Sequence, residues 1–296
     1  MVSQKREQTF QVGEECTIVV ETCSGDLELS GWDRHQVEVR SPDGEASVEQ
    51  DGPKLRIRTA PANDLTLRVP HFSDVKARLV SGDARLADMS GTVDIETKSG
   101  DVAATNHRGD LLIHTVSGDV SLRSCAVTGL DLRTVSGGCL VESEIDQEGT
   151  YRVSSVSGDL RLLIPEDQQC TVRMHSLSGR LRCRLPHSTP RHRRRETEAL
   201  INDGGVEFLV RTISGNVVVE AAKHLAESGA GPAHATEGAT VREREPETEP
   251  FGLDEGEAEE TAPSSSTAAQ RMEILRAIEE GEMSVDEGLD RLEQLD

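Results

Sequence analysis

Apolar and polar residues alternate in short runs over most of the chain, and many of these runs meet at a Ser-Gly pair. Residues 120–123 and 160–162 are two such runs, with an apolar side chain at every second position. A period of two is typical of a β-strand that buries one face and exposes the other. The pattern therefore predicts a protein built mainly from short β-strands.

The Ser-Gly pairs belong to a recurring phrase, which in most copies is Ser-Gly-Asp followed by an apolar residue. Glycine adopts positive φ without steric cost, and Ser and Asp side chains bond to nearby backbone groups, so the phrase predicts a turn. The glycines of these predicted repeat turns are Gly25, Gly82, Gly100, Gly118, Gly137, Gly158, Gly179 and Gly215.

From Gly82 to Gly179 the phrase returns every 18 to 21 residues. A short fixed period predicts a repeat architecture, because strands of this length cannot bury a core alone but stacked coils bury one continuously. We therefore predict a β-solenoid, with a twisted β-sandwich or β-meander as the alternative, since hairpins recur at a similar spacing. An aromatic content of only 2 % agrees with a thin aliphatic core.

Composition divides the chain into four predicted parts. Residues 1–78 form a less regular β-region that caps the repeats, and residues 79–221 form the repeat solenoid. Residues 222–267 are rich in Glu, Pro, Gly and Ser, which is typical of a disordered acidic linker. Residues 268–296 are predicted to form an α-helical hairpin.

The prediction of a hairpin depends on two apolar stripes at helical spacing. Gly281 is a candidate C-cap between them, and residues 284–287 have the form of a capping box. So short a module cannot bury its apolar stripes alone, and we expect it to self-associate or to dock on a protein partner. The candidate interaction residues of the stripes are Met272, Leu275, Ile278, Leu289 and Leu292.

The β-region resembles a known bacterial family. Residues 23–27 (Cys-Ser-Gly-Asp-Leu), 31–33 (Gly-Trp-Asp) and 69–70 (Val-Pro), together with the Ser-Gly-Asp series, are similar to the "putative adhesin" β-strand-repeat family. The resemblance covers roughly residues 10–221. This family is a domain of unknown function, so the resemblance implies a β-repeat fold and, by the family label, a surface role.

The C-terminal segment, residues 268–296, resembles a second module. Its phrase around residues 274–292 is similar to the short helical-hairpin domain that accompanies the β-repeat domain in envelope-stress proteins of the LiaX/YvlB type. The resemblance implies oligomerisation or protein docking through this segment, and a role in the bacterial envelope-stress response or its regulation.

The net charge of −22 is concentrated at the C-terminal end, where 20 acidic and 5 basic residues follow residue 225. This balance argues against nucleic acid as a partner, because phosphate binding needs clustered Lys and Arg. One basic cluster lies in an insertion that breaks the repeat period. It suits docking of an acidic partner, an anionic lipid surface or the acidic tail, and the alternative is a solvated loop or long hairpin turn. Its candidate interaction residues are Arg191, Arg193, Arg194 and Arg195.

The residues capable of chemistry form no recognisable set. The six cysteines include no C-x-x-C pair and no zinc-site spacing, so we predict free thiols that are buried or half-buried, with disulfides or metal or redox chemistry as alternatives. The nine histidines are scattered and no nucleophile motif accompanies them. We therefore predict no catalytic residues, no metal or cofactor site and no small-molecule substrate.

The N-terminal residues are polar and lack the apolar core of a signal peptide, and no run approaches the roughly 20 apolar residues of a membrane span. We expect a cytoplasmic protein with at most peripheral membrane contact. The leading hypothesis is a non-enzymatic scaffold or adaptor that binds protein through residues 268–296. The alternatives are a polymer-forming, cytoskeleton-like protein that stacks end to end through unpaired strands, and a surface adhesin, which would require export.

Overall fold

The computed structural model describes most of the β-region and a few positions near the C-terminus. The described ranges are 6–13, 15–21, 24–42, 46–60, 63–188, 190–193 and 195–222, with the single positions 273, 274, 277, 283, 287 and 291. Nearly all of the predicted linker lies outside these residues. Of the predicted hairpin contacts, Met272, Leu275, Ile278, Leu289 and Leu292 also lie outside them.

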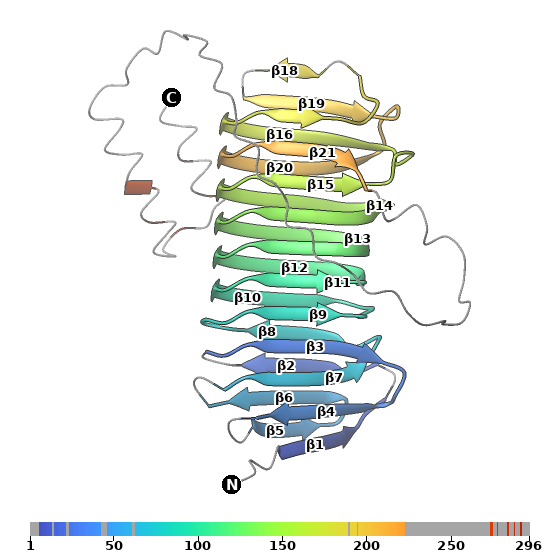
Figure 1. The fold of residues 1–296 in the computed structure, drawn as a ribbon, viewed down its shortest axis with the longest axis vertical. Helices are drawn as coiled ribbons and strands as arrows, with labels where there is room; N and C mark the ends of the chain where they lie inside the picture. Colours follow the sequence, from blue (N-terminus) through green and yellow to red (C-terminus); the bar gives the residue numbers. More distant parts are fainter. Residues whose placement is uncertain are drawn as a thin grey trace, which may run out of the picture.

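The β-region is a solenoid, as the repeat period predicts, and its strands stack along the long axis of the molecule (Figure 1). Each coil contributes one strand to each of two parallel stacks. In order of pairing, the first stack contains β6 (Lys54–Thr59), β2 (Thr17–Glu21), β8 (Asp74–Arg78), β10 (Val93–Ser99), β12 (Arg108–Ser117), β13 (Val120–Ser136), β14 (Cys139–Ser157), β20 (Val206–Ser214) and β16 (Cys170–Ser178).

The second stack is built in the same way, and the long strands β13 and β14 run through both. Its members in order of pairing are β7 (Leu65–Pro70), β3 (Leu27–Trp32), β9 (Ala84–Ala87), β11 (Val102–Thr105), β13, β14, β15 (Leu160–Ile164), β21 (Val217–Ala221) and β17 (Leu181–Cys183).

The core lies between the two stacks and consists mainly of aliphatic side chains. The alternation seen in the sequence becomes alternation of burial: in β10, Val93 and Ile95 are buried while Asp94 and Glu96 are partly exposed. Each inward residue packs on its counterpart in the next coil, so the core is one continuous column. Tyr151 and Phe208 form a stacked aromatic pair in it, with ring centroids 5.7 Å apart.

Succession along the chain is not succession in space at either end of the solenoid. The coil of β2 and β3 lies between the coil of β6 and β7 and that of β8 and β9. Similarly, β20 and β21 lie between β14 and β15 on one side and β16 and β17 on the other. The terminal coils are therefore held by strands that are distant in sequence.

Antiparallel strands close both ends of the stacks. At the N-terminal end, β4 (Gln36–Ser41) pairs with β7, β1 (Arg6–Gln11) pairs with β4, and β5 (Ala46–Asp51) pairs with β6. At the other end, β19 (Glu196–Ile201) pairs with β16, and β18 (Arg191–Arg193) pairs with β19. The predicted boundary at residues 78 and 79 falls between β8 and β9, which are successive strands of the parallel stacks.

Candidate functional site

The glycines of the Ser-Gly turns stack directly on one another along one edge of the solenoid. A Cβ at Gly100 would collide with the carbonyl oxygen of Gly82, and the same holds for Gly118 against Gly100. Positive φ also favours glycine at most of these turns, for example 121° at Gly100. At Gly179 and Gly215 the φ is not in this region, and there only the close approach of the neighbouring coil demands glycine.

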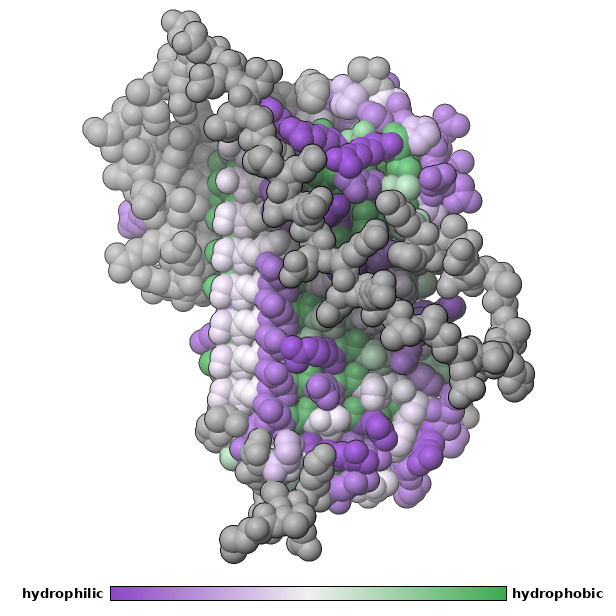
Figure 2. Space-filling model, viewed as in Figure 1, coloured by the Kyte–Doolittle hydropathy of each residue, from purple (hydrophilic) through white to green (hydrophobic). Residues whose placement is uncertain are grey.

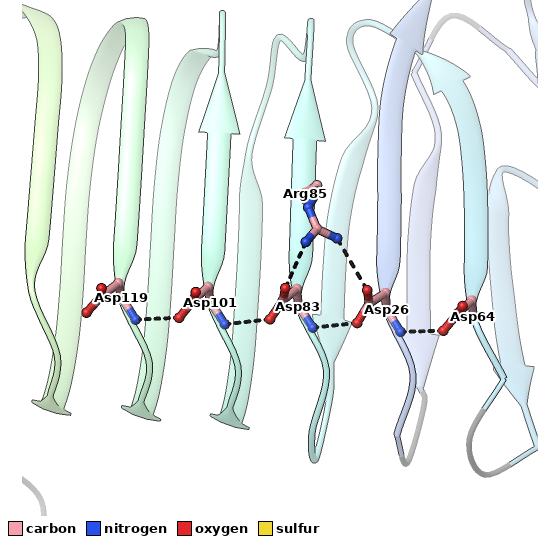
Figure 3. A network of polar contacts seen from close by, with 6 residues as sticks. All are labelled: Asp26, Asp64, Asp83, Arg85, Asp101 and Asp119. Carbon is pink, nitrogen blue, oxygen red and sulfur yellow. Dashed lines mark hydrogen bonds and ion pairs between the residues drawn. The ribbon is translucent and has the colours of Figure 1, made fainter. Parts of the chain in front are cut away.

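The aspartates of the turns bond from coil to coil rather than within their own turn. The Oδ1 atom of Asp83 accepts a hydrogen bond from the backbone N–H of Asp101 at 3.0 Å, and Asp101 accepts from Asp119 at 2.8 Å. Figure 3 shows these carboxylates pointing in the same direction along the stack. Arg85 bridges Asp26 and Asp83, at 3.3 and 2.8 Å, and so reduces repulsion within the column. The complete column on this part of the edge runs through Asp64, Asp26, Asp83, Asp101, Asp119 and Gly138.

A second column, of hydroxyl side chains, lies just inside this edge. The residue two positions before each turn Ser is Thr or Ser from β10 onward, and these residues are in register between coils. Thr134 is fully buried, and its Oγ1 donates to the carbonyl of Ser136 at 3.2 Å. Thr97 and Thr115 make the equivalent bond at 3.1 and 3.3 Å. Within the described residues, the buried Thr212 hydroxyl has no such partner.

Between the hydroxyl and the turn, one residue of each coil points outward, and together these residues form a row that we call the exterior row. Figure 2 shows the turn edge as a pale column beside a hydrophilic one, with apolar surface at the outer margin of the pale column. In spatial order, the exterior row consists of Val80, Lys98, Val116, Val135, Val156, Ile213 and Leu177.

The C-terminal segment contacts this row. Val116, Val135, Val156 and Ile213 form an apolar cluster, against which Ile274 and Met283 pack. Of the six described positions in the segment, 273, 274, 277, 287 and 291 are helical, and the backbone N–H of Met283 donates to the carbonyl of Ala277 at 3.1 Å. The hairpin as a whole stays a prediction, but two apolar side chains of this segment, Ile274 and Met283, pack on the solenoid. The sequence analysis missed this row, although aligning the repeats on Ser-Gly would have exposed it.

The predicted basic cluster lies in the capping hairpin. Arg191 is exposed in β18 and is paired in register with Glu198, and Arg193 is paired in register with Glu196. Arg195 follows at a turn, where its carbonyl accepts a hydrogen bond from the backbone N–H of Ser176 at 3.0 Å. Arg194 lies outside the described residues. The insertion therefore includes a short antiparallel hairpin, β18 and β19, at the end of the stack, and binding of a partner through it stays a prediction.

Several titratable groups are buried inside the solenoid, and burial shifts their pKa values. Burial lowers the pKa of His107 to about 4, against a smaller opposing effect of Asp110. Burial raises the pKa of Cys139 and of Cys170 to about 12, so both remain protonated thiols at neutral pH. All five described cysteines are free, and no group of three His, Cys, Asp or Glu residues is placed to hold a metal ion in the part of the chain described. The missing sixth cysteine, Cys23, lies outside that part.

These features define a class of protein: a two-faced parallel β-solenoid whose coils are locked by stacked glycines and coil-to-coil aspartate bonds. Residues 14–220 match the family model of the Toastrack domain DUF4097, and the chain belongs to that family. The predicted resemblance to a β-strand-repeat domain of unknown function is thereby confirmed for the body. A search of curated proteins found no match.

A search of solved structures found similar chains that are named as adhesins or binding proteins. A "putative adhesin" from Bacteroides fragilis is 13 % identical, with a TM-score of 0.37, and the match covers 73 % of this chain and 97 % of that one. A "putative cell adhesion protein" from Clostridium sporogenes is 10 % identical, with a TM-score of 0.30, and the match covers 73 % of this chain and 99 % of that one. A "putative lipid binding protein" from Parabacteroides distasonis is 10 % identical, with a TM-score of 0.29, and the match covers 74 % of this chain and 98 % of that one.

No helix in the described part of the chain is long and apolar enough to cross a membrane.

Proposed function

We propose that the protein is a non-enzymatic scaffold or adaptor, in which the β-solenoid is a rigid platform and residues 268–296 bind a protein partner. The observation that carries the proposal is the packing of Ile274 and Met283 on the apolar exterior row. Apolar side chains on so short a segment are stabilised only against another protein surface, because the segment is too small to form its own core. Here that surface belongs to the solenoid, and a partner with a similar apolar strip would serve equally.

By its resemblance to envelope-stress proteins, we place the adaptor in the bacterial envelope-stress response and expect it in the cytoplasm. Fractionation of the source cells would check the location, and recovery at the cell surface would favour the adhesin hypothesis instead. Survival of a deletion strain under a cell-wall antibiotic would check the role, with altered survival expected.

The partner-binding proposal is tested by affinity capture on the full-length protein from extract of the source bacterium. We expect captured proteins that bind the wild type and are lost with the double variant Ile274→Glu and Met283→Glu. The matched control is Val80→Glu, which adds a charge to the exterior row at a position that is 48 % exposed and should leave capture unchanged. An identical set of captured proteins for the wild type and the double variant would contradict the proposal.

A polymer-forming protein is the competing structural hypothesis, and the outermost strands argue against it. In the described body these strands are β1, β5, β17 and β18, with the sequences REQTFQ, ASVEQD, LRC and RHR, and each carries at least one charged residue. Charged residues on edge strands oppose pairing between copies. We expect no filaments in electron micrographs of the purified protein, and filaments longer than a few molecules would favour the polymer hypothesis.

A further inference from the structure

We propose that the exterior row is a docking surface for residues 268–296 of the same chain, so that the segment that recruits partners is held against the solenoid in the resting protein. This inference rests on the proposed function and adds its regulation. A partner would then compete with the exterior row for the same apolar side chains of the segment.

Burial along the row supports docking at one part of it. Val80 is 48 % exposed, whereas Val135 and Val156, at the equivalent position of other coils, are 8 % and 9 % exposed. The repeat gives these residues the same backbone environment, so the difference comes from their neighbours in the row and from the side chains that cover them. Ile274 and Met283 pack on the cluster that contains Val135 and Val156. Lys98 interrupts the apolar row between Val80 and Val116, and this charge marks one end of the docking surface.

Charge complementarity supports the same occupant. The next outward position on the covered strands carries Arg133 in β13 and Arg211 in β20, on coils separated by that of β14. Residues 268–296 contain nine acidic and three basic residues. The Arg133 guanidinium is already bonded to the carboxylate of Asp131, at 3.1 and 3.0 Å, so the attraction that an acidic segment gains here adds modestly to the burial of its apolar side chains, and salt weakens it.

The length of chain between the two parts allows docking within one molecule. Fifty residues, 223–272, separate Ala222, the last residue described in the body, from Glu273. Fully extended, they would span on the order of 160 Å, at about 3.3 Å per residue. The exterior row from Val80 to Leu177 has seven members and is roughly 30 Å long at about 4.8 Å per coil. The segment therefore reaches every position of the row, and the tether gives it a high effective concentration there.

The proposal predicts opposite effects for changes on the two sides of the contact. Val135→Glu damages the docking surface and frees the segment, so partner capture should increase. Ile274→Glu damages the segment and uncovers the row, so partner capture should decrease while the row becomes able to accept another copy of the segment. We expect the body to remain folded with a charge at this position, since the exposed Lys98 already occupies the equivalent place in another coil.

The test uses a fluorescent synthetic peptide of residues 268–296 as the probe, titrated with full-length variants. We expect Ile274→Glu to bind the peptide at least about 10-fold more tightly than the wild type, whose row is occupied. Adding Val135→Glu to that variant should abolish the gain, and adding Val80→Glu should not. Circular dichroism and the fluorescence of Trp32, in the N-terminal part of the body, verify that each variant is folded.

Equal binding of the peptide by the wild type and Ile274→Glu would overturn the proposal, as would binding that Val135→Glu does not weaken. Light scattering distinguishes docking within one chain from docking of a second copy. A wild-type dimer that Ile274→Glu converts to a monomer would mean that a second copy supplies the segment. If the peptide binds as expected but capture from cell extract does not depend on Ile274, the docking surface stands and the adaptor function fails. If capture from cell extract depends on Ile274 but the wild type and Ile274→Glu bind the peptide equally, the adaptor function stands and the proposed docking surface fails.

Discussion

The backbone N–H of Asp119 donates a hydrogen bond to the carboxylate of Asp101, 2.8 Å away, although 18 residues separate them. Because a coil is about 4.8 Å high, an aspartate side chain at the turn reaches one coil and no further. Hydrogen bonds to an ionised carboxylate are stronger than neutral ones. The aspartate column therefore helps to hold neighbouring coils in register along the exposed turn edge.

Removing one carboxylate from this column should weaken the body measurably. We expect Asp101→Ala to lower the free energy of unfolding by about 1–2 kcal/mol, because the N–H of Asp119 loses its acceptor. Asp101→Asn keeps an acceptor oxygen and should cost less, since Asn216 already accepts from the N–H of Arg180 at 3.3 Å in the same kind of turn. Denaturant unfolding provides the measurement. The control is Asp167→Ala, which removes an exposed turn carboxylate outside the column; an equal loss there would refute the role of the column.

The glycine column leads to a prediction that separates backbone conformation from packing. Gly100→Ala should lower the free energy of unfolding by roughly 3 kcal/mol or more, because its φ of 121° and the approach of the Gly82 carbonyl both exclude a Cβ. Gly215→Ala should also be strongly destabilising, through the close approach of the Gly158 carbonyl and without any contribution from a positive φ. Gly52 has a φ of 58° but no atom within 4 Å of an added Cβ, so Gly52→Ala should cost about 1 kcal/mol. Thermal unfolding measures all three, and a mild Gly215→Ala would contradict the packing argument.

The buried histidine should make the body sensitive to acid. His107 is 1 % exposed, and its pKa of about 4 in the folded protein lies below its ordinary value of 6.5. Between these pH values the unfolded chain binds a proton at His107 that the folded chain does not. The contribution of neutral His107 to the free energy of unfolding is therefore fully present above pH 6.5 and is lost as the pH falls towards 4. Summed over this window, the loss is about 3 kcal/mol.

Replacement of the histidine isolates its contribution. In His107→Leu we expect the free energy of unfolding to lose this part of its pH dependence, while the part that comes from carboxylates remains. The measurement is denaturant unfolding at several pH values between 4 and 7, with the wild type alongside. Parallel curves for the two proteins would show that His107 titrates in the same range in the folded and unfolded states.

The hydroxyl column predicts different effects for the same substitution at two equivalent positions. Thr134→Val removes the hydrogen bond to the Ser136 carbonyl and should lower the free energy of unfolding by about 1 kcal/mol. Thr212→Val replaces a buried hydroxyl that has no partner among the described residues, and should be neutral or stabilising. Val matches Thr in shape, so packing is preserved at both sites. Similar losses at both positions would mean that the hydroxyl bond contributes nothing.

Much of the body could be predicted from local patterns. The alternation of apolar residues predicted the strands, because burial of one face acts within each strand, and the Ser-Gly-Asp phrase predicted the turns. Only one of the two reasons for glycine at these turns could be predicted from the sequence. Positive φ is a local property, whereas the contact between Gly215 and the Gly158 carbonyl joins residues 57 positions apart. The same limit applies to the aspartates, which looked like turn formers and proved to bond to the next coil.

The sequence by itself determined that the chain forms a β-solenoid with repeated glycine turns, because strand period and turn chemistry are properties of neighbouring residues. Only the tertiary structure decided the exchanged order of the terminal coils, as when β20 pairs with both β14 and β16, and the burial of Val135 under Ile274 and Met283. These arrangements depend on contacts between distant segments. A periodic chain offers many equivalent surfaces for such contacts, and the choice among them follows from how the whole molecule packs.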